Sequence, residues 1–299
     1  MSRTVDLSIV GPGHVGSTLA VLAVRAGLRV AVGGRRIERA RQAALEAGEG
    51  AAACTIDRAV AAGRLVLLTV SDPAIAPLCS DLAQRGRFRA GQVVAHCSGL
   101  LDSEALAPAR RAGCHVGSLH PLATFPTVSA ACEAFDYTWC FVEGDEPAVE
   151  ALEELARRLG AARCVRLRPG RKALYHASAV FACNYLATLL DAAADLARQA
   201  GVPDHQALPA MEGLVRATVD NVLTLGPAAA LTGPIARGDV QAVRLHLESM
   251  ADLEPSLVAL YRQAGLRTVE LALKRGSIDD AQANALRQVL TGEGEAPNH

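Results

Sequence analysis

The sequence predicts an α/β protein in two parts. The N-terminal domain has a doubly wound, mostly parallel sheet, and an all-α C-terminal domain built on a long central helix follows. Residues 5–167 alternate short apolar, strand-like runs with helical patterns, which is typical of a parallel sheet covered by helices on both faces. Arg168-Pro169-Gly170 breaks the alternation, and the patterns after it are helical. We expect domains at residues 1–168 and 169–291, with a disordered tail at 292–299.

Composition supports two folded domains and excludes some classes of function. The chain has 299 residues, of which 51% are hydrophobic, enough for a substantial core. Its 30 basic and 31 acidic residues leave a net charge of −1. A protein that binds nucleic acid or an acidic membrane surface would carry a basic excess. An aromatic content of 3% also argues against a surface for stacking bases.

In the N-terminal domain, apolar runs of four to six residues predict the strands, and longer amphipathic stretches predict the helices. The expected strands are residues 5–10, 28–32, 51–54, 65–70, 92–96, 115–119, 137–142 and 163–167. The expected helices are residues 15–26, 37–47, 75–84, 103–112 and 147–159.

The C-terminal domain begins with one long expected helix, residues 171–200, which Gly201 and Pro203 end. Within it, residues 173–190 carry no formal charge and approach the length of a membrane span. Polar side chains such as His176 and Asn184 would be costly in lipid, so we expect a buried central helix of a soluble protein. Further helices are expected at residues 206–225, 240–250 (with Asp239 as N-cap), 255–272 and 279–290.

Cysteine usage and the N-terminus indicate a cytoplasmic protein. The eight cysteines form no C-x-x-C pair and match no zinc spacing, so we expect buried free thiols and no metal. Free thiols fit a reducing compartment. The N-terminus has no basic region followed by a hydrophobic run and a cleavage site.

A glycine-rich loop follows the first expected strand and opens the first helix. Its residues are Gly11, Pro12, Gly13, His14, Val15 and Gly16. In this strand–loop–helix context, G-x-G-x-x-G predicts a Rossmann dinucleotide-binding loop. The first glycine allows the tight turn, the second lets a pyrophosphate approach the backbone, and the third lets helix and strand pack closely. The N–H groups that begin the helix would meet the phosphate charge.

The end of the second expected strand favours NADP over NAD. An NAD enzyme usually places an acidic residue there to bind the ribose hydroxyls, whereas this chain has Arg35 and Arg36. Arginine suits a 2′-phosphate through charge and forked hydrogen bonding, although both side chains could simply be solvated. Ser71, Asp72 and Pro73 end the fourth strand, either near the nicotinamide ribose or only as the start of a helix.

Three polar clusters lie where a substrate could meet a nicotinamide. Ser98 follows the fifth strand and His120 follows the sixth, at the strand ends that carry ligand groups in such sheets. On the long helix, Lys172 and His176 share a face, with Asn184 close beside it. A core histidine, a helix–helix hydrogen bond and simple turns remain alternative explanations of these positions.

A later loop, residues 231–239, could also reach a ligand. Thr232 could bind a substrate and Arg237 could hold a carboxylate. The alternative is a plain helix–helix connection that Asp239 caps.

The motifs together resemble a family of Rossmann-like oxidoreductases that carry a C-terminal domain of unknown function. The matching blocks are residues 11–16, 96–99, 117–122, 174–186 and 231–239. The family is more distantly similar to pyrroline-5-carboxylate reductase, ketopantoate reductase and the β-hydroxyacid dehydrogenases, and is often likened to deazaflavin-dependent NADP oxidoreductases. The resemblance implies NADP as cofactor and a homodimer formed through the helical domain.

One position departs from the distant relatives. Ketopantoate reductase and the β-hydroxyacid dehydrogenases place a catalytic lysine four residues before an asparagine of the long helix. Here Val180 occupies that position before Asn184, and the nearest polar residues are His176 and Lys172.

We therefore predict an NADP-dependent oxidoreductase that transfers a hydride between nicotinamide and a C=O or C=N of a small metabolite that bears a carboxylate. His176 would be the proton donor, because imidazole titrates near working pH. Ser98 and Asn184 would orient the substrate, and the residues expected to line its pocket are His120, Lys172, Thr232 and Arg237. The alternatives are a non-catalytic NADP-binding sensor or regulator, and a deazaflavin-linked NADP oxidoreductase.

Overall fold

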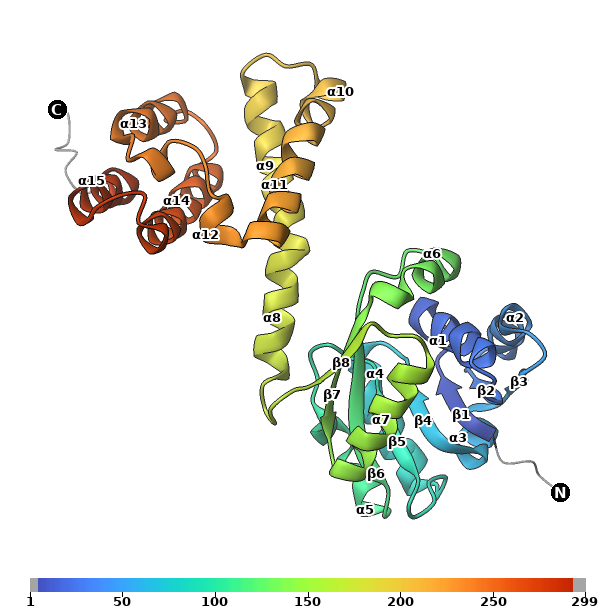
Figure 1. The fold of residues 1–299 in the computed structure, drawn as a ribbon. Helices are drawn as coiled ribbons and strands as arrows, with labels where there is room; N and C mark the ends of the chain where they lie inside the picture. The colour runs from blue at the N-terminus through green and yellow to red at the C-terminus, as the bar shows by residue number, and fades with distance from the viewer. Residues whose placement is uncertain (1–4, 293–299) are drawn as a thin grey trace. The chain divides into compact units, whose positions relative to one another are not determined.

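The computed structural model describes residues 5–292 and divides into two compact units, Met1–Asn184 and Tyr185–His299 (Figure 1). By its contacts, the first part of the long helix belongs with the first unit, beyond the boundary expected at residue 168. The predicted tail lies, from residue 293 onward, outside the described residues.

The first unit is built on one eight-stranded sheet with the order β3-β2-β1-β4-β5-β6-β7-β8. All neighbouring pairs are parallel except β6 and β7. This confirms the predicted doubly wound, mostly parallel sheet. The strands are β1 Val5–Val10, β2 Val30–Gly33, β3 Ala51–Cys54, β4 Gly63–Leu68, β5 Val93–His96, β6 His115–Leu122, β7 Trp139–Gly144 and β8 Arg163–Arg166.

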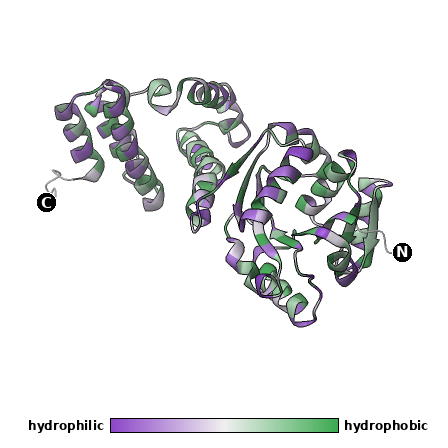
Figure 2. Ribbon diagram, turned by 60° about the horizontal axis from the view of Figure 1, so that its bottom comes forward, coloured by the Kyte–Doolittle hydropathy of each residue, from purple (hydrophilic) through white to green (hydrophobic). Residues whose placement is uncertain are grey.

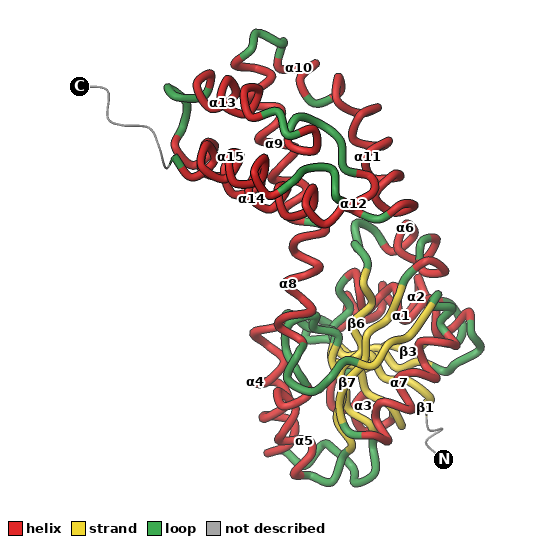
Figure 3. Tube along the Cα trace, turned by 60° about the vertical axis from the view of Figure 1, so that its left-hand side comes forward, coloured by secondary structure: helices red, strands yellow, loops and turns green. Residues whose placement is uncertain are grey.

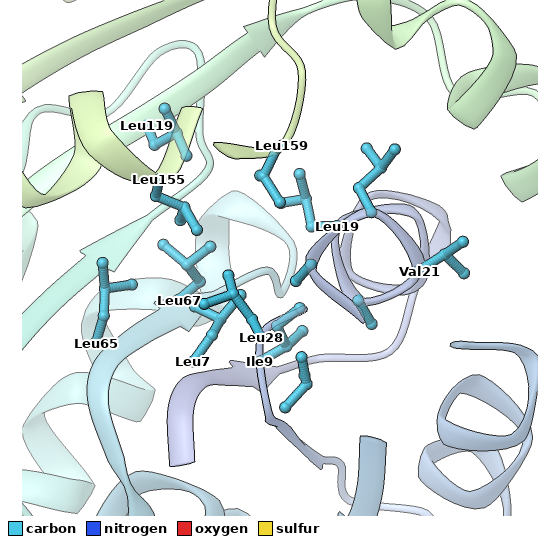
Figure 4. Close-up of a cluster of buried hydrophobic side chains, with 14 of the residues drawn as sticks. Leu7, Ile9, Leu19, Val21, Leu28, Leu65, Leu67, Leu119, Leu155 and Leu159 are labelled. Atoms are coloured by element: carbon cyan, nitrogen blue, oxygen red, sulfur yellow. The ribbon is translucent and has the colours of Figure 1, made fainter. Parts of the chain in front are cut away.

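Helices cover both faces of this sheet, because alternate residues of each strand point to opposite faces. Leu7, Ile9 and Leu67 of the strands pack with Leu19 of α1 and Leu155 of α7 in one core (Figure 4). A second core forms on the other face, where α4 packs Ile75 against Val66 of β4. The helices alternate hydrophobic and hydrophilic stretches, as half-buried helices must (Figure 2). They are α1 His14–Arg25, α2 Ile37–Ala47, α3 Ile56–Ala62, α4 Asp72–Gln84, η1 Ser103–Leu106, α5 Ala107–Arg111, α6 Val128–Glu133, η2 Phe135–Tyr137, α7 Glu146–Arg158 and α8 Lys172–Ala182.

Strand β6 continues three residues past its predicted end. The strand was predicted to end at residue 119, which would place His120 in a loop. The antiparallel neighbour β7 extends the ladder, pairing His120 with Phe141 and Leu122 with Trp139. His120 therefore stands on a strand rather than in a connecting loop.

The described part of the second unit consists of helices and loops (Figure 3). Its buried core joins α13, α14 and α15, with Val243, Val269 and Leu286 at its centre. Asp239 caps α13 as expected, accepting a hydrogen bond from the amide of Ala242. The helices are α9 Asn184–Gln199, α10 Asp204–Ala207, η3 Pro209–Met211, α11 Glu212–Leu225, α12 Pro227–Ala230, η4 Ile235–Arg237, α13 Val240–Ser249, α14 Pro255–Arg275 and α15 Asp280–Thr291.

Two expected helices are interrupted. The helix predicted at residues 171–200 breaks between α8 and α9, where Cys183 leaves regular helical angles with φ −117° and ψ −64°. The helix predicted at residues 206–225 is divided into α10, η3 and α11. Pro209 lacks an amide donor and begins the short 3₁₀ turn between the two helices.

The prediction that the long helix is buried is wrong for the single chain. Lys172–Gln199, taken as one stretch, is long and apolar enough to cross a membrane, with a mean hydropathy of 1.3 over its most apolar window. Only 6% of that window is buried. Nor are all cysteines buried: the eight are unpaired, and Cys183 is exposed. Most of the apolar side chains in this window are therefore exposed or only partly buried within one chain.

Candidate active site

A pocket of about 830 Å³ opens beside the glycine-rich loop of the first unit. The loops that follow β1, β2 and β4 form most of it, so it lies at the carboxyl ends of central parallel strands, where such sheets bind ligands. Most of the predicted cofactor-binding residues contribute to it. Its lining comprises Gly11, Pro12, Gly13, Gly34, Arg35, Arg36, Arg39, Ile56, Thr69, Val70, Ser71, Pro73, Ala74, Pro77 and Leu78.

The glycines of the loop fit a bound pyrophosphate. Gly11 has φ +113°, and an added Cβ would meet the backbone of Thr69 at 2.9 Å. A Cβ on Gly16 would collide with the Gly11 carbonyl, to which the Thr69 hydroxyl donates a hydrogen bond of 2.7 Å. At Gly13, the N-cap residue of α1, an added Cβ would find no atom within 4 Å. Open space therefore lies over the first turn of α1, whose N–H groups can bind an anion.

Three arginines line one side of this pocket without a counter-charge. Arg35 and Arg36 precede α2 and Arg39 lies on its first turn; all three are exposed. Within residues 5–292, none of them forms an ion pair or side-chain hydrogen bond. Arg39 was not predicted as a site residue, although it lies only three residues after Arg36, in the first turn of α2. The cluster can bind a phosphate that carries two negative charges.

Of the three residues predicted after β4, two line the pocket and one forms a hydrogen bond with Ser98. Ser71 and Pro73 line the pocket, with Ser71 at the N-cap position of α4 and Pro73 in its first turn. Asp72 instead accepts a hydrogen bond of 2.7 Å from the Ser98 hydroxyl. His14 lies exposed and bonds through Nδ1 to the Phe125 carbonyl at 2.8 Å. Asp72 thus links the cofactor loop to the second candidate cluster.

Ser98 occupies a tightly held turn after β5. Its hydroxyl donates to Asp72 and accepts from the amides of Leu100 and Leu101 at 3.1 and 2.9 Å. His96 accepts from the Ser98 amide at 3.2 Å, and burial lowers the pKa of His96 to about 4. With its donor and both acceptor positions in use, the Ser98 hydroxyl favours the turn that the sequence analysis kept as an alternative.

Lys172 lies under this turn, 1% exposed. Its Nζ donates to the Ser98 carbonyl at 2.5 Å and to the Ser118 hydroxyl at 2.8 Å. Ser118 in turn donates to buried Glu143 at 2.7 Å, and Ser103 adds two further donors to the same carboxylate. Burial lowers the pKa of Lys172 to about 8, against the attraction of Glu143. This burial favours a positioning role for Lys172 over the substrate contact that the sequence analysis predicted.

His120 and His176 meet above Gly99. An added Cβ on Gly99 would lie 2.8 Å from both His120 Nε2 and His176 Cδ2. His120 Nδ1 lies 2.7 Å from the Tyr175 hydroxyl oxygen. The Tyr175 ring packs on the Phe141 ring, with the ring centroids 4.4 Å apart. Burial lowers the pKa of His120 to about 4, with added repulsion from Lys172 and His176. The first turns of α8 therefore bring two imidazoles and a phenol to one point of the sheet.

The register of the sheet explains this meeting. Ser118 pairs with Glu143 and His120 pairs with Phe141 across β6 and β7. Side chains two residues apart on a strand share a face, so both pairs face α8. Lys172 reaches the first pair, and Tyr175, three residues later on the same side of the helix, reaches the second.

The remaining predicted site residues lie elsewhere. Asn184 is exposed at the start of α9, about 12 Å along the helix from His176 at 1.5 Å per residue. Thr232 and Arg237 are exposed residues of the second unit, before and within η4. Their predicted contacts with a substrate stay predictions. Among the residues that the structure describes, no group of three or more His, Cys, Asp or Glu side chains could hold a metal ion.

Comparison with known families agrees with this architecture. Residues 2–121 match the model of a Rossmann-like domain, and residues 138–268 match a domain of unknown function, DUF2520. The two matches follow each other along the chain in the order that the resemblance implied. No curated protein matches it.

Solved structures of similar fold include a protein designated an NADP oxidoreductase, a reductive aminase and a reductase. A Bacteroides fragilis protein designated an NADP oxidoreductase has 25% identity and a TM-score of 0.69, over 91% of this chain and 100% of its own. A reductive aminase from Aspergillus terreus, solved with NADPH and ethyl-5-oxohexanoate, has 16% identity and a TM-score of 0.59, over 97% and 93%. A pyrroline-5-carboxylate reductase from Coxiella burnetii has 15% identity and a TM-score of 0.55, over 96% and 99%. The similarities to the reductive aminase and to the pyrroline-5-carboxylate reductase show a shared fold and no more.

Proposed function

We propose that the protein is an NADP-dependent oxidoreductase that transfers a hydride between nicotinamide and a C=O or C=N group of a small metabolite. The observation that carries the proposal is the cluster of three unpaired arginines beside an open glycine loop in one pocket. The similarity to the Bacteroides fragilis protein supports it. We also propose that the substrate carries a carboxylate and that the protein is located in the cytoplasm.

The residues divide the binding of the cofactor among them. Gly11, Gly13 and the first turn of α1 would hold the pyrophosphate, and the three arginines would hold the 2′-phosphate. Ser71 would lie along the path toward the nicotinamide. When bound, the cofactor supplies the hydride; the protein supplies position, a dry environment and a proton.

The reacting group of the substrate would lie near Gly99, where His120 and His176 meet. A Cβ on residue 99 would lie 2.8 Å from both rings, so glycine is needed for the two imidazoles to pack this close to the backbone. Either imidazole could supply the proton, and the sequence analysis favoured His176. Ser98, through its turn, and Asn184 would orient the substrate.

The arginine cluster yields a test of the cofactor. Wild-type protein should bind NADPH at least about tenfold more tightly than NADH, which corresponds to about 1.4 kcal/mol. Arg35→Ala/Arg36→Ala should remove this preference, because the 2′-phosphate loses its forked partners. Isothermal titration with both cofactors measures it. Arg41→Ala is the matched control, since Arg41 is exposed on the same helix but outside the pocket lining. Equal wild-type affinities for the two cofactors would contradict the proposal.

We also propose that the second unit forms a homodimer. Helices α9 and α11 expose large apolar side chains, among them Leu214 at 72% and Leu223 at 80%. A groove of about 600 Å³ between Leu190, Leu208 and Val219 adds a concave surface. Apolar patches of this kind mark association sites, and a second copy carries a matching patch.

Sedimentation measures this association. Wild-type protein should sediment at twice its chain mass of 31.1 kDa, and Leu223→Glu should sediment as a monomer. Leu45→Glu alters an equally exposed leucine on α2, 77% exposed, and should leave the dimer intact. A monomeric wild type at micromolar concentration would contradict the proposal.

A further inference from the structure

Tyr175 and His120 form a hydrogen bond as well as a contact between their rings. The phenol oxygen lies 2.7 Å from His120 Nδ1, and the two rings meet edge to face at 78° with centroids 5.6 Å apart. The Tyr175 ring also packs on the Phe141 ring, with the ring centroids 4.4 Å apart. The phenol and the imidazole are therefore fixed relative to each other.

The direction of this hydrogen bond determines which nitrogen of His120 carries the proton. A phenol O–H is a stronger hydrogen-bond donor than an imidazole N–H. An unprotonated imidazole nitrogen is a stronger acceptor than a phenol oxygen. Burial raises the pKa of Tyr175, so the phenol keeps its proton. Tyr175 thus donates to Nδ1, and neutral His120 carries its own proton on Nε2.

The surroundings of His120 keep its ring neutral. Lys172 and His176 on α8 both oppose a positive charge on it, and only Asp72 on α4 favours one. The Asp72 carboxylate already accepts the Ser98 hydroxyl. A neutral ring with a fixed tautomer presents one N–H donor at one place.

That donor has no hydrogen-bond partner among the described residues, and His120 is partly exposed. His120 Nε2 is 2.8 Å from where a side chain of Gly99 would begin, at the point that His176 also reaches. On the opposite edge of the ring, Nδ1 is occupied by Tyr175. The imidazole therefore stands between the phenol proton of Tyr175 and a position beside Nε2 that a substrate oxygen could take.

We propose that Tyr175 and His120 form a two-step proton relay to the oxygen of a carbonyl substrate held beside His120 Nε2. The inference rests on the proposed function and narrows its substrate to ketones and aldehydes. A neutral N–H donor needs a lone pair to bind, which a carbonyl oxygen offers and a protonated iminium nitrogen lacks. His120 is then the catalytic residue, Tyr175 is a positioning residue and proton source, and His176 contacts the rest of the substrate.

The transfer balances in protons and electrons. As the carbonyl carbon accepts a hydride, the electron pair of the C=O π bond moves to oxygen, which takes the Nε2 proton of His120. His120 Nδ1 takes the phenol proton of Tyr175, and water reprotonates the phenolate. The imidazole is neutral before and after, and one hydride and one proton have converted a carbonyl to an alcohol.

The tautomer of His120 is the first test and needs neither cofactor nor substrate. Long-range ¹H–¹⁵N spectra of the ¹⁵N-labelled protein should show His120 as the neutral Nε2–H form from pH 6 to 8. In Tyr175→Phe this tautomer should lose its dominance, since the donor to Nδ1 is gone. A second pair, Tyr261 and His246, has the same 2.7 Å bond outside the site. Tyr261→Phe is therefore the matched control and should leave the His120 signals unchanged. A predominant Nδ1–H form in the wild type would overturn the relay.

Turnover is the second test. NADPH oxidation is followed with pyruvate, glyoxylate and ethyl 5-oxohexanoate as carbonyl probes, and with 1-pyrroline as an imine probe. With a carbonyl probe, His120→Asn should lower kcat by about 100-fold and Tyr175→Phe by at least about tenfold. His176→Asn should act mainly on KM, and Tyr261→Phe on neither constant.

The outcomes separate the relay from the proposed function. Unchanged kcat in Tyr175→Phe, or a kcat loss larger in His176→Asn than in His120→Asn, would overturn the relay alone. Turnover of 1-pyrroline with no carbonyl reduced would overturn the substrate class and leave the oxidoreductase intact. Absence of NADPH binding would sink the proposed function itself, whatever the tautomer of His120.

Discussion

Gly13→Val should abolish NADPH binding while leaving the protein folded. Gly13 has φ −86° and ψ −173°, an extended conformation that valine adopts without strain. An added Cβ there would meet no atom within 4 Å, so the substitution disturbs no packing. The valine would instead fill the space that a pyrophosphate needs next to the first turn of α1. We expect at least about a 100-fold loss of affinity, near 2.7 kcal/mol, by titration calorimetry.

Gly213→Val provides the matched control for this variant. Gly213 also has open space around its Cβ position and lies on α11, outside the pocket. It should bind NADPH as the wild type does, and both variants should melt close to the wild-type temperature. Normal binding by Gly13→Val would show that residues 11–16 do not hold the phosphates.

Lys172→Met should cause the largest loss of stability. The substitution removes the cation that the Ser118 hydroxyl links to the buried Glu143 carboxylate, and it leaves the Ser98 carbonyl without its donor. Breaking a buried charge pair from one side costs about 3–5 kcal/mol. For a chain of this size that corresponds to roughly a 6–15 °C fall in melting temperature. Lys274→Met alters the only other lysine, which is exposed, and should cost little.

Glu143→Gln tests whether the two groups act as a pair. Each single variant leaves one buried charge without its partner, whereas Lys172→Met/Glu143→Gln leaves neither. The double variant should therefore be more stable than the sum of the single losses predicts, by about 1–3 kcal/mol. Strict additivity in denaturant titrations would contradict a coupled pair.

The same lysine should leave a signature in the pH dependence of stability. Its pKa falls from 10.5 to about 8 on folding, so between these values the unfolded chain binds a proton that the folded chain has released. The free energy of unfolding of the wild type, relative to that of Lys172→Met, should then rise with pH from 8 to 10.5. The expected gain is about 1–3 kcal/mol. A flat difference would mean that Lys172 titrates alike in both states.

Much of the first unit could be predicted because its signals are local. Apolar runs and the glycine loop mark strands and turns in a few consecutive residues, so the central sheet and Gly11–Gly16 needed no knowledge of distant partners. The end of β6 did need such knowledge, since only pairing with β7 carries the strand through His120. Sequence pattern does not reveal that antiparallel register.

The hydrogen-bond network of Lys172, Ser118 and Glu143 could not be predicted for a similar reason. Lys172 and His176 were correctly seen as neighbours on one helix, but Lys172 was expected to meet a substrate. Its burial depends on Ser118 and Glu143, which lie 54 and 29 residues away in sequence. Glu143 was not predicted as a site residue because a single acidic residue in an apolar strand matches no sequence motif. The break at Cys183 likewise has no Gly or Pro to mark it.

The two matched families meet inside the sheet rather than between folded units. The Rossmann-like match ends at residue 121 and the DUF2520 match begins at residue 138, yet β7 and β8 complete the sheet that β1 begins. A fragment cut between these matches would leave the eight-residue strand β6 as a bare edge, open to pairing with other chains. It would also separate Ser118 from both Glu143 and Lys172. The modules that sequence families delimit are therefore not the pieces into which this protein can be divided for expression or recombined with other partners.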